Sequence, residues 1–539
     1  MIPESLRKAL VGISPYFCFL LAIVTLGPLQ FGFHLAELNA PQDVITCRRK
    51  DIAAPSWSAT SLLAPSTAHH SLPDCIPMSE ARFATVSSVY TIGGLIGALA
   101  AGPFCSHNGR RPAMAVASFI FLVGSLVETF SASVAVLAVG RVLNGLSAGA
   151  STVIVPLYIS EVAPPASRGF FGAFTQITVN VGILFVQTLG FFLSHDSAWR
   201  FILGTGIIIA LINLVGMWGV AESPAWLVTY KGQSVRAHFI LQRIRGAGVS
   251  IADEVAAWPP SGLQHGFSSQ HDGINSTGVA STVPAEEQAL LVPPVNEEGV
   301  YVIAPPSPRP FVPSVPSPSL LSVGFFKVVT DAHYRPAIIA VIGIMFAQQV
   351  CGINSVIMYS VSLLNGMLPL NSALLTIIIS AVNLVTTMLC APLPDRLGRK
   401  TCLLVSVVGQ GMSSLALAFS IVFGVKILSA FSVLTFVAFF AVGLGPVPFI
   451  LASELVGQEA VGATQSWALG ANYIATFLVA QFFPMVNSAL NARLGGAGWV
   501  YFLFAGCAAL STVFFWIYVP ETKGKKDADE VWGRTTRLD

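Results

Sequence analysis

Three amide side chains stand close together in the second half of the chain. Gln348 and Gln349 are followed by Gly352 and Asn354, all inside a long apolar segment. In hydrocarbon each polar group needs a hydrogen-bonding partner, and on a helix positions 349 and 354 lie within about 140° of each other. Uncharged amides suit a neutral ligand with many hydroxyl groups, such as a sugar, in a wet central cavity. The alternative is that they hydrogen-bond neighbouring helices to one another.

The composition of the chain places it in a membrane. Of its 539 residues, 54% are hydrophobic and only 10% are charged, which is far from the composition of a soluble globular protein. The net charge of +2 gives no sign of a nucleic-acid partner. The sequence carries no nucleotide-binding loop, metal-ligand cluster or nucleophile elbow, so we expect no enzyme, no ATP-driven pump, no metal and no cofactor.

Apolar stretches long enough to span a bilayer recur along the chain. They lie near 14–34, 82–105, 112–133, 135–160, 170–193, 200–220, 336–364, 370–393, 402–424, 427–452, 463–486 and 498–519. The first carries no small-residue cleavage site and is interpreted as a genuine span. The sequence therefore predicts an all-α membrane protein with twelve transmembrane helices in two six-helix halves, residues 1–220 and 336–519.

Basic residues distinguish the two sides of the membrane. Most Lys and Arg residues fall on one side, which comprises the N-terminus, the turns 106–111, 161–168 and 395–400, the region 221–335 and the tail 520–539. The positive-inside rule makes this side cytoplasmic and predicts that both termini are cytoplasmic. Arg48-Arg49-Lys50, in the opposite loop 35–80, runs against the rule. The membrane is expected to be the plasma membrane or a vacuolar membrane.

The sequence also makes predictions for the region 221–335 and for the loop 35–80. In the region 221–335, residues 222–245 are typical of an amphipathic helix, and 255–320 has the Pro, Ser and Gly content of a disordered linker. Cys47 and Cys75 share the loop 35–80. They would pair if this loop faces an oxidising compartment, and the sequence leaves that pairing open.

Three polar signatures occur in both halves, which indicates an internal duplication. The pairs are Ser106–Arg111 with Asp395–Lys400, Ser160-Glu161 with Ser453-Glu454, and Glu222-Ser223-Pro224 with Pro520-Glu521-Thr522. Both halves therefore have the same orientation, and their charged residues lie on one surface.

We expect these charged residues to form a latch on the cytoplasmic side. The basic members are Arg110, Arg111, Arg168, Arg396 and Arg399, and the acidic members are Glu161, Glu222, Glu454 and Glu521. Pairs between the halves would close the cytoplasmic side when the cavity opens outward and would break when it opens inward. The alternative is that the arginines only anchor to lipid headgroups and set the topology.

The chain resembles the sugar porter family of the major facilitator superfamily, and in particular the facilitative glucose transporters and their fungal relatives. The motifs that carry this resemblance are Leu29–Phe33, Gly140-Arg141, Pro156-Leu157-Tyr158, Arg168-Gly169, Glu222–Leu227, Gln348–Asn354, Asp395–Lys400, Gly445–Pro448 and Pro520–Gly524. The resemblance covers nearly the whole chain except the loop 35–80 and the linker 255–320. The resemblance implies the major facilitator fold and a carrier that moves a hexose by alternating access.

The resemblance also implies which residues hold the sugar. The expected ligands are Gln176, Gln348, Gln349, Asn354, Asn383 and Asn472. Gln176, Asn383 and Asn472 are isolated amides in apolar spans, so each is a cavity candidate in its own right, with helix–helix hydrogen bonding as the alternative.

The tenth span is expected to be broken and to act as a gate. Pro446 and Pro448 free backbone groups there and predict a kink, and the family uses this break as a gate. Phe449 and Tyr473 stand where glucose carriers have gating tryptophans. Ala441 replaces a Glu of the family, and Val461 replaces the Arg that would balance Arg168. These departures leave the identity of the sugar open.

Coupling to protons depends on the first span. His34 stands where proton-driven members of the family have an Asp, and uniporters have a neutral residue there. Histidine titrates near physiological pH, Arg141 on the fourth span would disfavour its protonated form, and Glu37 would counter that effect. A proton role for His34 with Arg141, and a plain ligand or packing role, both stand as alternatives.

The sequence thus predicts a carrier of a hexose or similar polyhydroxylated solute, facilitative or proton-coupled. Its partners are the small-molecule sugar, the lipid bilayer and, if transport is coupled, protons; no oligomeric state is predicted. Two rivals remain. One is a sugar sensor that binds without net transport, and the other is a carrier for inositol, quinate or another polyol.

Overall fold

The computed structural model describes residues 13–48, 72–246, 248–256, 258, 325–364, 372–457, 460–525 and 528–534. Within these residues, twelve helical segments are long and apolar enough to cross a membrane, as the sequence predicts. The linker predicted over 255–320 lies almost wholly outside the described residues, as do residues 49–71 of the loop 35–80.

The first six spans contain seven helices. They are α2 (Pro15–Val24) with α3 (Leu26–Ala36), α5 (Glu80–Asn108), α6 (Arg110–Thr129), α7 (Val134–Val162), α8 (Arg168–Leu193) and α9 (Trp199–Gly216). Ser79 and Ser133 begin α5 and α7 by accepting a hydrogen bond from a backbone N–H of the first turn. Glycines let α5 and α7 approach closely: a Cβ at Gly145 or Gly149 would overlap the α5 backbone.

The last six spans contain eight helices. They are α14 (Arg335–Val350) with α15 (Ile353–Leu364), α16 (Ser372–Cys390), α18 (Arg399–Val422), α19 (Lys426–Val442) with α20 (Val447–Glu454), α21 (Val461–Leu494) and α22 (Trp499–Tyr518). The seventh span is thus interrupted at Gly352, and the tenth between Val442 and Val447. The interruption of the tenth span falls where the sequence predicts it.

Short helices connect the spans. They are α4 (Gln42–Ile45), η1 (Pro165–Ser167), η2 (Asp196–Ala198), α10 (Pro224–Lys231), α11 (Ser234–Arg245), α12 (Ala252–Ala256), α13 (Lys327–Thr330), α17 (Leu393–Leu397) and α23 (Ala528–Val531). The single amphipathic helix predicted over 222–245 is two helices, because Gly232 adopts a left-handed conformation that ends α10.

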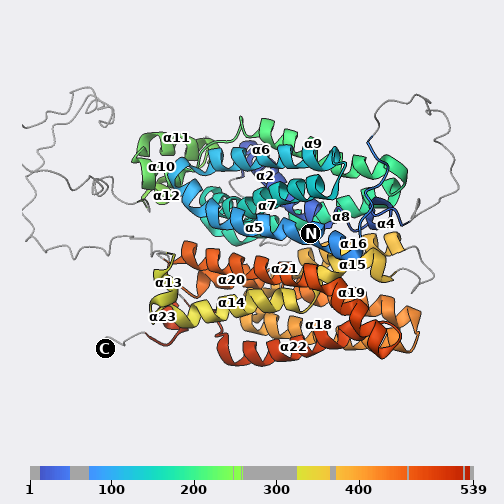
Figure 1. Ribbon diagram of the computed structural model, residues 1–539. Coiled ribbons are helices and arrows are strands. Elements are labelled where there is room, and N and C mark those ends of the chain that lie inside the picture. Colours follow the sequence, from blue (N-terminus) through green and yellow to red (C-terminus); the bar gives the residue numbers. More distant parts are fainter. Residues whose placement is uncertain are drawn as a thin grey trace, which may run out of the picture. The chain divides into compact units, whose positions relative to one another are not determined.

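The two halves meet along two pairs of helices. In Figure 1 the N-terminal helices are blue to green and the C-terminal helices are yellow to red, and α5 packs against α21 while α8 packs against α16. Hydrogen bonds cross this boundary: Asn39 Nδ2 donates to the Ile357 carbonyl (2.8 Å), and Ser88 Oγ donates to Gln481 Oε1 (2.7 Å).

The internal duplication is visible at one end of each half. Gly109 and Gly398 both have φ 102° and begin α6 and α18. Glu222 accepts from the backbone N–H of Arg110 (2.9 Å) in the first half, and Glu521 accepts from that of Arg399 (2.8 Å) in the second. A Cβ at either glycine would lie 2.5 Å from a carboxylate oxygen. An anion at a helix N-terminus is stabilised by the unpaired amides and the helix dipole.

In this conformation, the contacts of the charged residues differ from those of the predicted latch in two respects. First, Glu222 and Glu521 bind backbone amides rather than arginine side chains. Second, the ion pairs that the described residues form here stay within one half: Arg110–Glu161 (2.7 Å) in the first and Arg399–Glu454 (2.9 Å) in the second. The reason is that each glycine turn places its arginine beside the end of a helix of the same half.

The other arginines of the predicted latch make different contacts. The Arg111 Nε donates to the Met217 carbonyl at 3.0 Å. Arg396 is exposed, and the side chain of Arg168 lies outside the described residues.

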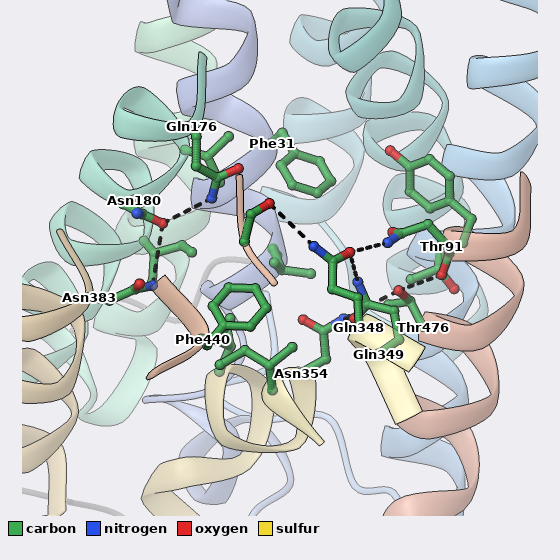
Figure 2. Close-up of a pocket in the computed structure, with 18 of the residues that line it drawn as sticks. Phe31, Thr91, Gln176, Asn180, Gln348, Gln349, Asn354, Asn383, Phe440 and Thr476 are labelled. Carbon is green, nitrogen blue, oxygen red and sulfur yellow. Dashed lines mark hydrogen bonds between the residues drawn. The ribbon is translucent and has the colours of Figure 1, made fainter. Parts of the chain in front are cut away.

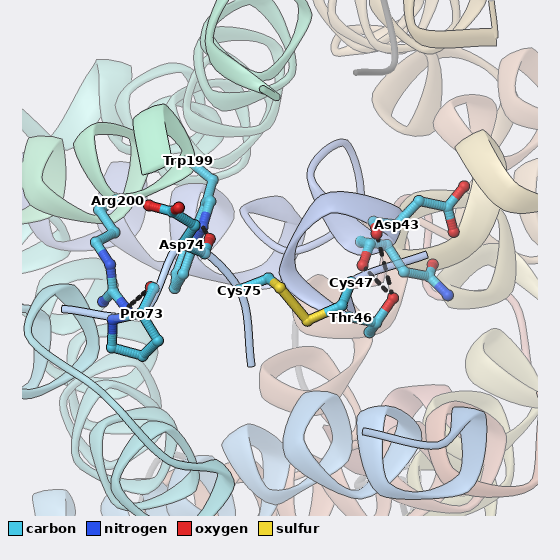
Figure 3. Close-up of a disulfide and its surroundings, with 9 residues drawn as sticks. Asp43, Thr46, Cys47, Pro73, Asp74, Cys75, Trp199 and Arg200 are labelled. Carbon is cyan, nitrogen blue, oxygen red and sulfur yellow. Dashed lines mark hydrogen bonds between the residues drawn. A yellow bond between two sulfur atoms is a disulfide. The ribbon is translucent and has the colours of Figure 1, made fainter. Parts of the chain in front are cut away.

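A disulfide joins Cys47 to Cys75, the pairing that the sequence leaves open. Figure 3 shows it beside the segment that leads into the second span. This segment is also held to α9, because Trp199 Nε1 donates to the Asp74 carbonyl at 2.7 Å and the Arg200 guanidinium donates to the Pro73 carbonyl at 2.9 Å.

Gly352→Ala is expected to destabilise the protein by about 1–3 kcal/mol. Gly352 has φ +100°, which is unfavourable for residues with a side chain, and a Cβ would lie 2.6 Å from the ring of Phe504. Thermal unfolding of the purified protein measures this loss. Gly506→Ala, on α22, is the matched control, since its Cβ would meet open space. Equal unfolding temperatures for the two variants would contradict the expectation.

Candidate functional site

A cavity lies between the two halves and is lined by every amide that the sequence predicts to hold a solute. These amides are Gln176 on α8, Gln348 and Gln349 on α14, Asn354 on α15, Asn383 on α16 and Asn472 on α21. Phe31, Tyr90 and Phe440 add aromatic surface to the lining. Figure 2 shows the amides in two groups on opposite sides of the cavity.

The larger group is a hydrogen-bonded chain within the C-terminal half. Gln349 Nε2 donates to Gln348 Oε1 (3.0 Å), and Gln348 Oε1 also accepts from Asn472 Nδ2. Asn354 Nδ2 donates to Gln349 Oε1 and, at 3.3 Å, to Thr476 Oγ1. The amides therefore join α14, α15 and α21. They also present exchangeable donors and acceptors to the cavity.

Gln348 also contacts the break in the tenth span. Its Nε2 donates to the Leu444 carbonyl, four residues before Pro448. Proline has no N–H, so this carbonyl lacks its helical partner. The Gln348 side chain takes the place of that partner. The position of the broken helix is thereby tied to the amides of the cavity.

The smaller group bridges the two halves. Asn180 lies on α8 one turn after Gln176 and accepts from its Nε2 at 3.4 Å. Asn180 Nδ2 donates to Thr387 Oγ1 on α16 (2.9 Å), and Asn383 Nδ2 donates to Asn180 Oδ1 (3.4 Å). Within the described part of the chain, Asn383 Oδ1 is buried without a hydrogen-bond partner. This oxygen is an open acceptor for a ligand hydroxyl.

Asn180 is absent from the sequence-based prediction. The signal that identifies it is its position four residues after Gln176 in an apolar span, because residues at this spacing share one helix face.

The predicted gate residues lie around the cavity. Phe449 and Tyr473 line it. The Tyr473 hydroxyl lies 3.4 Å from Thr152 Oγ1 of the other half. Pro446 precedes the first residue of α20, and Pro448 is buried in its first turn. The break is thus present, while the gating role of these residues stays a prediction.

Beside the cavity, the first half contains a fully buried cluster of charged residues. His34 and Arg141, predicted as neighbours, meet through Glu37. Arg141 NH1 donates to Glu37 Oε1 (2.6 Å), and His34 Nδ1 lies 2.9 Å from Glu37 Oε2.

The cluster contains one residue that the sequence-based prediction missed. Glu128 of α6 has 0% exposure, and its Oε2 lies 4.0 Å from His34 Nδ1. A carboxylate inside the apolar span 112–133 is the signal that identifies it, because ionisable groups at membrane depth are costly and usually functional.

The chain is similar in sequence to known transport proteins. A profile of the family described as Sugar (and other) transporter matches residues 20–258 and 321–531. A probable metabolite transport protein of Saccharomyces cerevisiae is 31% identical over 511 residues, which cover 95% of this chain and 93% of that protein. Facilitated glucose transporter member 3 of Homo sapiens is 27% identical over 534 residues, which cover 96% of this chain and 92% of that protein.

A solved structure has the same fold. The xylose transporter XylE from E. coli, in a partially occluded inward-open conformation, matches with a TM-score of 0.67 at 22% sequence identity. The match covers 95% of this chain and 100% of that chain.

Proposed function

Since the chain belongs to the sugar (and other) transporter family, we propose that it carries a hexose or a similar polyhydroxylated solute across a membrane by alternating access. Its fold is the major facilitator fold that the sequence predicts, twelve spans in two halves. Such a carrier performs no covalent chemistry on its solute.

One observation carries this proposal: the predicted amides from both halves line a single cavity together with aromatic rings. Neutral donors and acceptors match hydroxyl groups, and the rings match the apolar faces of a sugar ring. A hydroxyl placed between Asn383 and Gln176 would be hydrogen-bonded by both halves at once. The solute would therefore bind most tightly when the halves close around it.

Alternating access requires the contacts between the halves to break in turn. The bonds Asn180–Thr387 and Ser88–Gln481 cross the boundary and are two of the contacts that must open. Because these bonds join uncharged groups, each contributes only about 0.5–1.5 kcal/mol. A bound solute can replace them at low cost. We assign Phe449 and Tyr473 to the gate that covers the solute.

The charged clusters at the cytoplasmic ends stiffen each half. In the first half, the helix ends are joined by the Arg110–Glu161 ion pair and by Glu222. In the second half, they are joined by the Arg399–Glu454 ion pair and by Glu521. Each half then moves as one body during the cycle. We place both termini in the cytosol, in the plasma membrane or a vacuolar membrane, because these clusters lie on the side that carries most of the Lys and Arg residues.

Uptake by the purified protein in liposomes tests the proposal. Labelled hexoses and polyols are offered with and without an imposed pH gradient. Saturable uptake of a hexose is expected, and its response to the gradient separates facilitative from proton-coupled transport. Saturable uptake of inositol or another polyol, without uptake of a hexose, would show that the solute is a polyol and not a hexose. Binding of a sugar without its transport would show that the protein is a receptor and not a carrier.

A further inference from the structure

The buried cluster in the first half has an unbalanced charge. It contains two carboxyl groups, Glu37 and Glu128, and one guanidinium, Arg141, all with 0% exposure. His34 is neutral when its Nδ1–H donates to Glu37 and its Nε2 accepts from Ser125 (3.4 Å). If both carboxyl groups were ionised, a net negative charge would be buried at membrane depth, which is strongly unfavourable.

The two carboxyl groups differ in their surroundings. Both oxygens of Glu37 have a partner, one in Arg141 and the other in His34. Within the described part of the chain, neither oxygen of Glu128 has a hydrogen-bond partner, although both are buried. Glu37 is therefore the ionised member, and Glu128 is the member that remains uncompensated.

Among the described residues, the elements around Glu128 place no second cation in an ion pair with it. From α5, the Tyr90 ring lies 4.5 Å beneath the Arg141 guanidinium. From α7, Asn144 Nδ2 lies 3.4 Å from His34 Nδ1. Within the described residues, Asn144 Oδ1 has no hydrogen-bond partner. From α9, Arg200 donates to the backbone carbonyls of Thr129, Ser131 and Pro73. Because Arg141 is already paired with Glu37, a bound cation can supply the charge that Glu128 lacks.

We propose that Glu128 binds a proton in this conformation and releases it to water in another state of the transport cycle. The step is the loss of H⁺ from the neutral carboxyl, which leaves the carboxylate and a protonated water. Binding of the proton stands on the cluster alone, and its exchange during transport rests on the proposed function. A metal ion is the less suitable occupant. The His34, Glu37 and Glu128 ligand atoms lie within 4.8 Å of one another, but Glu37 is already paired with Arg141.

A physical path connects this site to the solute cavity. Tyr90 lines the cavity, its hydroxyl donates to the Phe31 carbonyl (3.0 Å), and its ring contacts Arg141. Leu35, next to His34, also lines the cavity. A solute that displaces Tyr90 or α3 would thus move Arg141 relative to the two carboxyl groups. That movement would change how firmly Glu128 holds its proton.

Infrared difference spectra of the reconstituted full-length protein test the proton directly. A protonated carboxyl has a C=O stretching band that an ionised one lacks. We expect such a band at neutral pH, its loss at alkaline pH, and its absence from Glu128→Gln. Glu80→Gln is the matched control, because Glu80 is exposed and pairs with Arg48, and it is expected to keep the band. Glu128→Asp keeps a carboxyl and is expected to retain a shifted band.

Transport assays on the same samples separate the two parts of the proposal. With Glu128→Gln, exchange of solute without a gradient is expected to persist, while accumulation driven by a pH gradient is lost. A band that Glu128→Gln does not remove would overturn the proton site, as would a band removed by CaCl₂ or MnCl₂ at fixed pH. Unchanged accumulation would overturn proton exchange. If the wild type transports no solute but its band depends on Glu128, the proposed function fails and the proton site stands.

Discussion

Replacing both Gln348 and Gln349 by alanine is expected to reduce the efficiency of uptake by up to about a hundredfold. The two side chains offer the solute the densest set of donors and acceptors in the cavity, and each lost hydrogen bond costs about 0.5–1.5 kcal/mol. Two bonds at the upper end of this range amount to about 100-fold. Gln348 also pairs with the carbonyl that Pro448 leaves free, so its loss loosens the broken tenth span. Initial rates of uptake into liposomes measure the effect.

Gln187→Ala is the matched control for this double variant. Gln187 is buried on α8, the helix of Gln176, but it does not line the cavity. We expect its uptake to stay near the wild-type rate. A double variant that is monodisperse and transports as well as this control would show that the amides only join helices.

Arg141→Met is expected to destabilise the protein by about 3–5 kcal/mol. The substitution leaves the Glu37 carboxylate without its cation in a fully buried site, and the loss of one partner of a buried ion pair has a cost of this order. Thermal unfolding followed by size-exclusion chromatography measures the loss of stability.

Two further variants show whether charge is the cause. Arg141→Met combined with Glu37→Gln removes both members of the ion pair, so we expect it to recover most of the lost stability. Arg236→Met replaces an exposed arginine on α11 and is expected to change stability by no more than about 0.5 kcal/mol. If the double variant is no more stable than Arg141→Met alone, the effect comes from packing and the charge argument fails.

The elements that the sequence predicts well are those set by local chemistry. Spans follow from runs of apolar residues. The interruption of the tenth span follows from Pro446 and Pro448, because a missing N–H acts within one helical turn. The gathering of the amides in one cavity could be predicted because isolated polar groups in apolar spans must face away from lipid.

What the sequence does not predict depends on contacts between distant residues. Charge patterns placed Glu222 and Glu521 on the surface that carries the arginines. They did not reveal that the glycine turns leave free backbone amides for these carboxylates. The role of Glu128 depends on which groups surround it. His34 and Arg141 come from other helices, so no local pattern shows that their charges leave Glu128 uncompensated.

The two glycine turns also have a consequence for the order of synthesis. Glu222 follows Arg110 by 112 residues and closes the first half just after its sixth span. The first half can therefore form this contact before the seventh span has been synthesised and inserted into the membrane. Glu521 closes the second half only after its twelfth span, 122 residues after Arg399. We therefore expect the first half to close earlier during translation than the second, which is closed last.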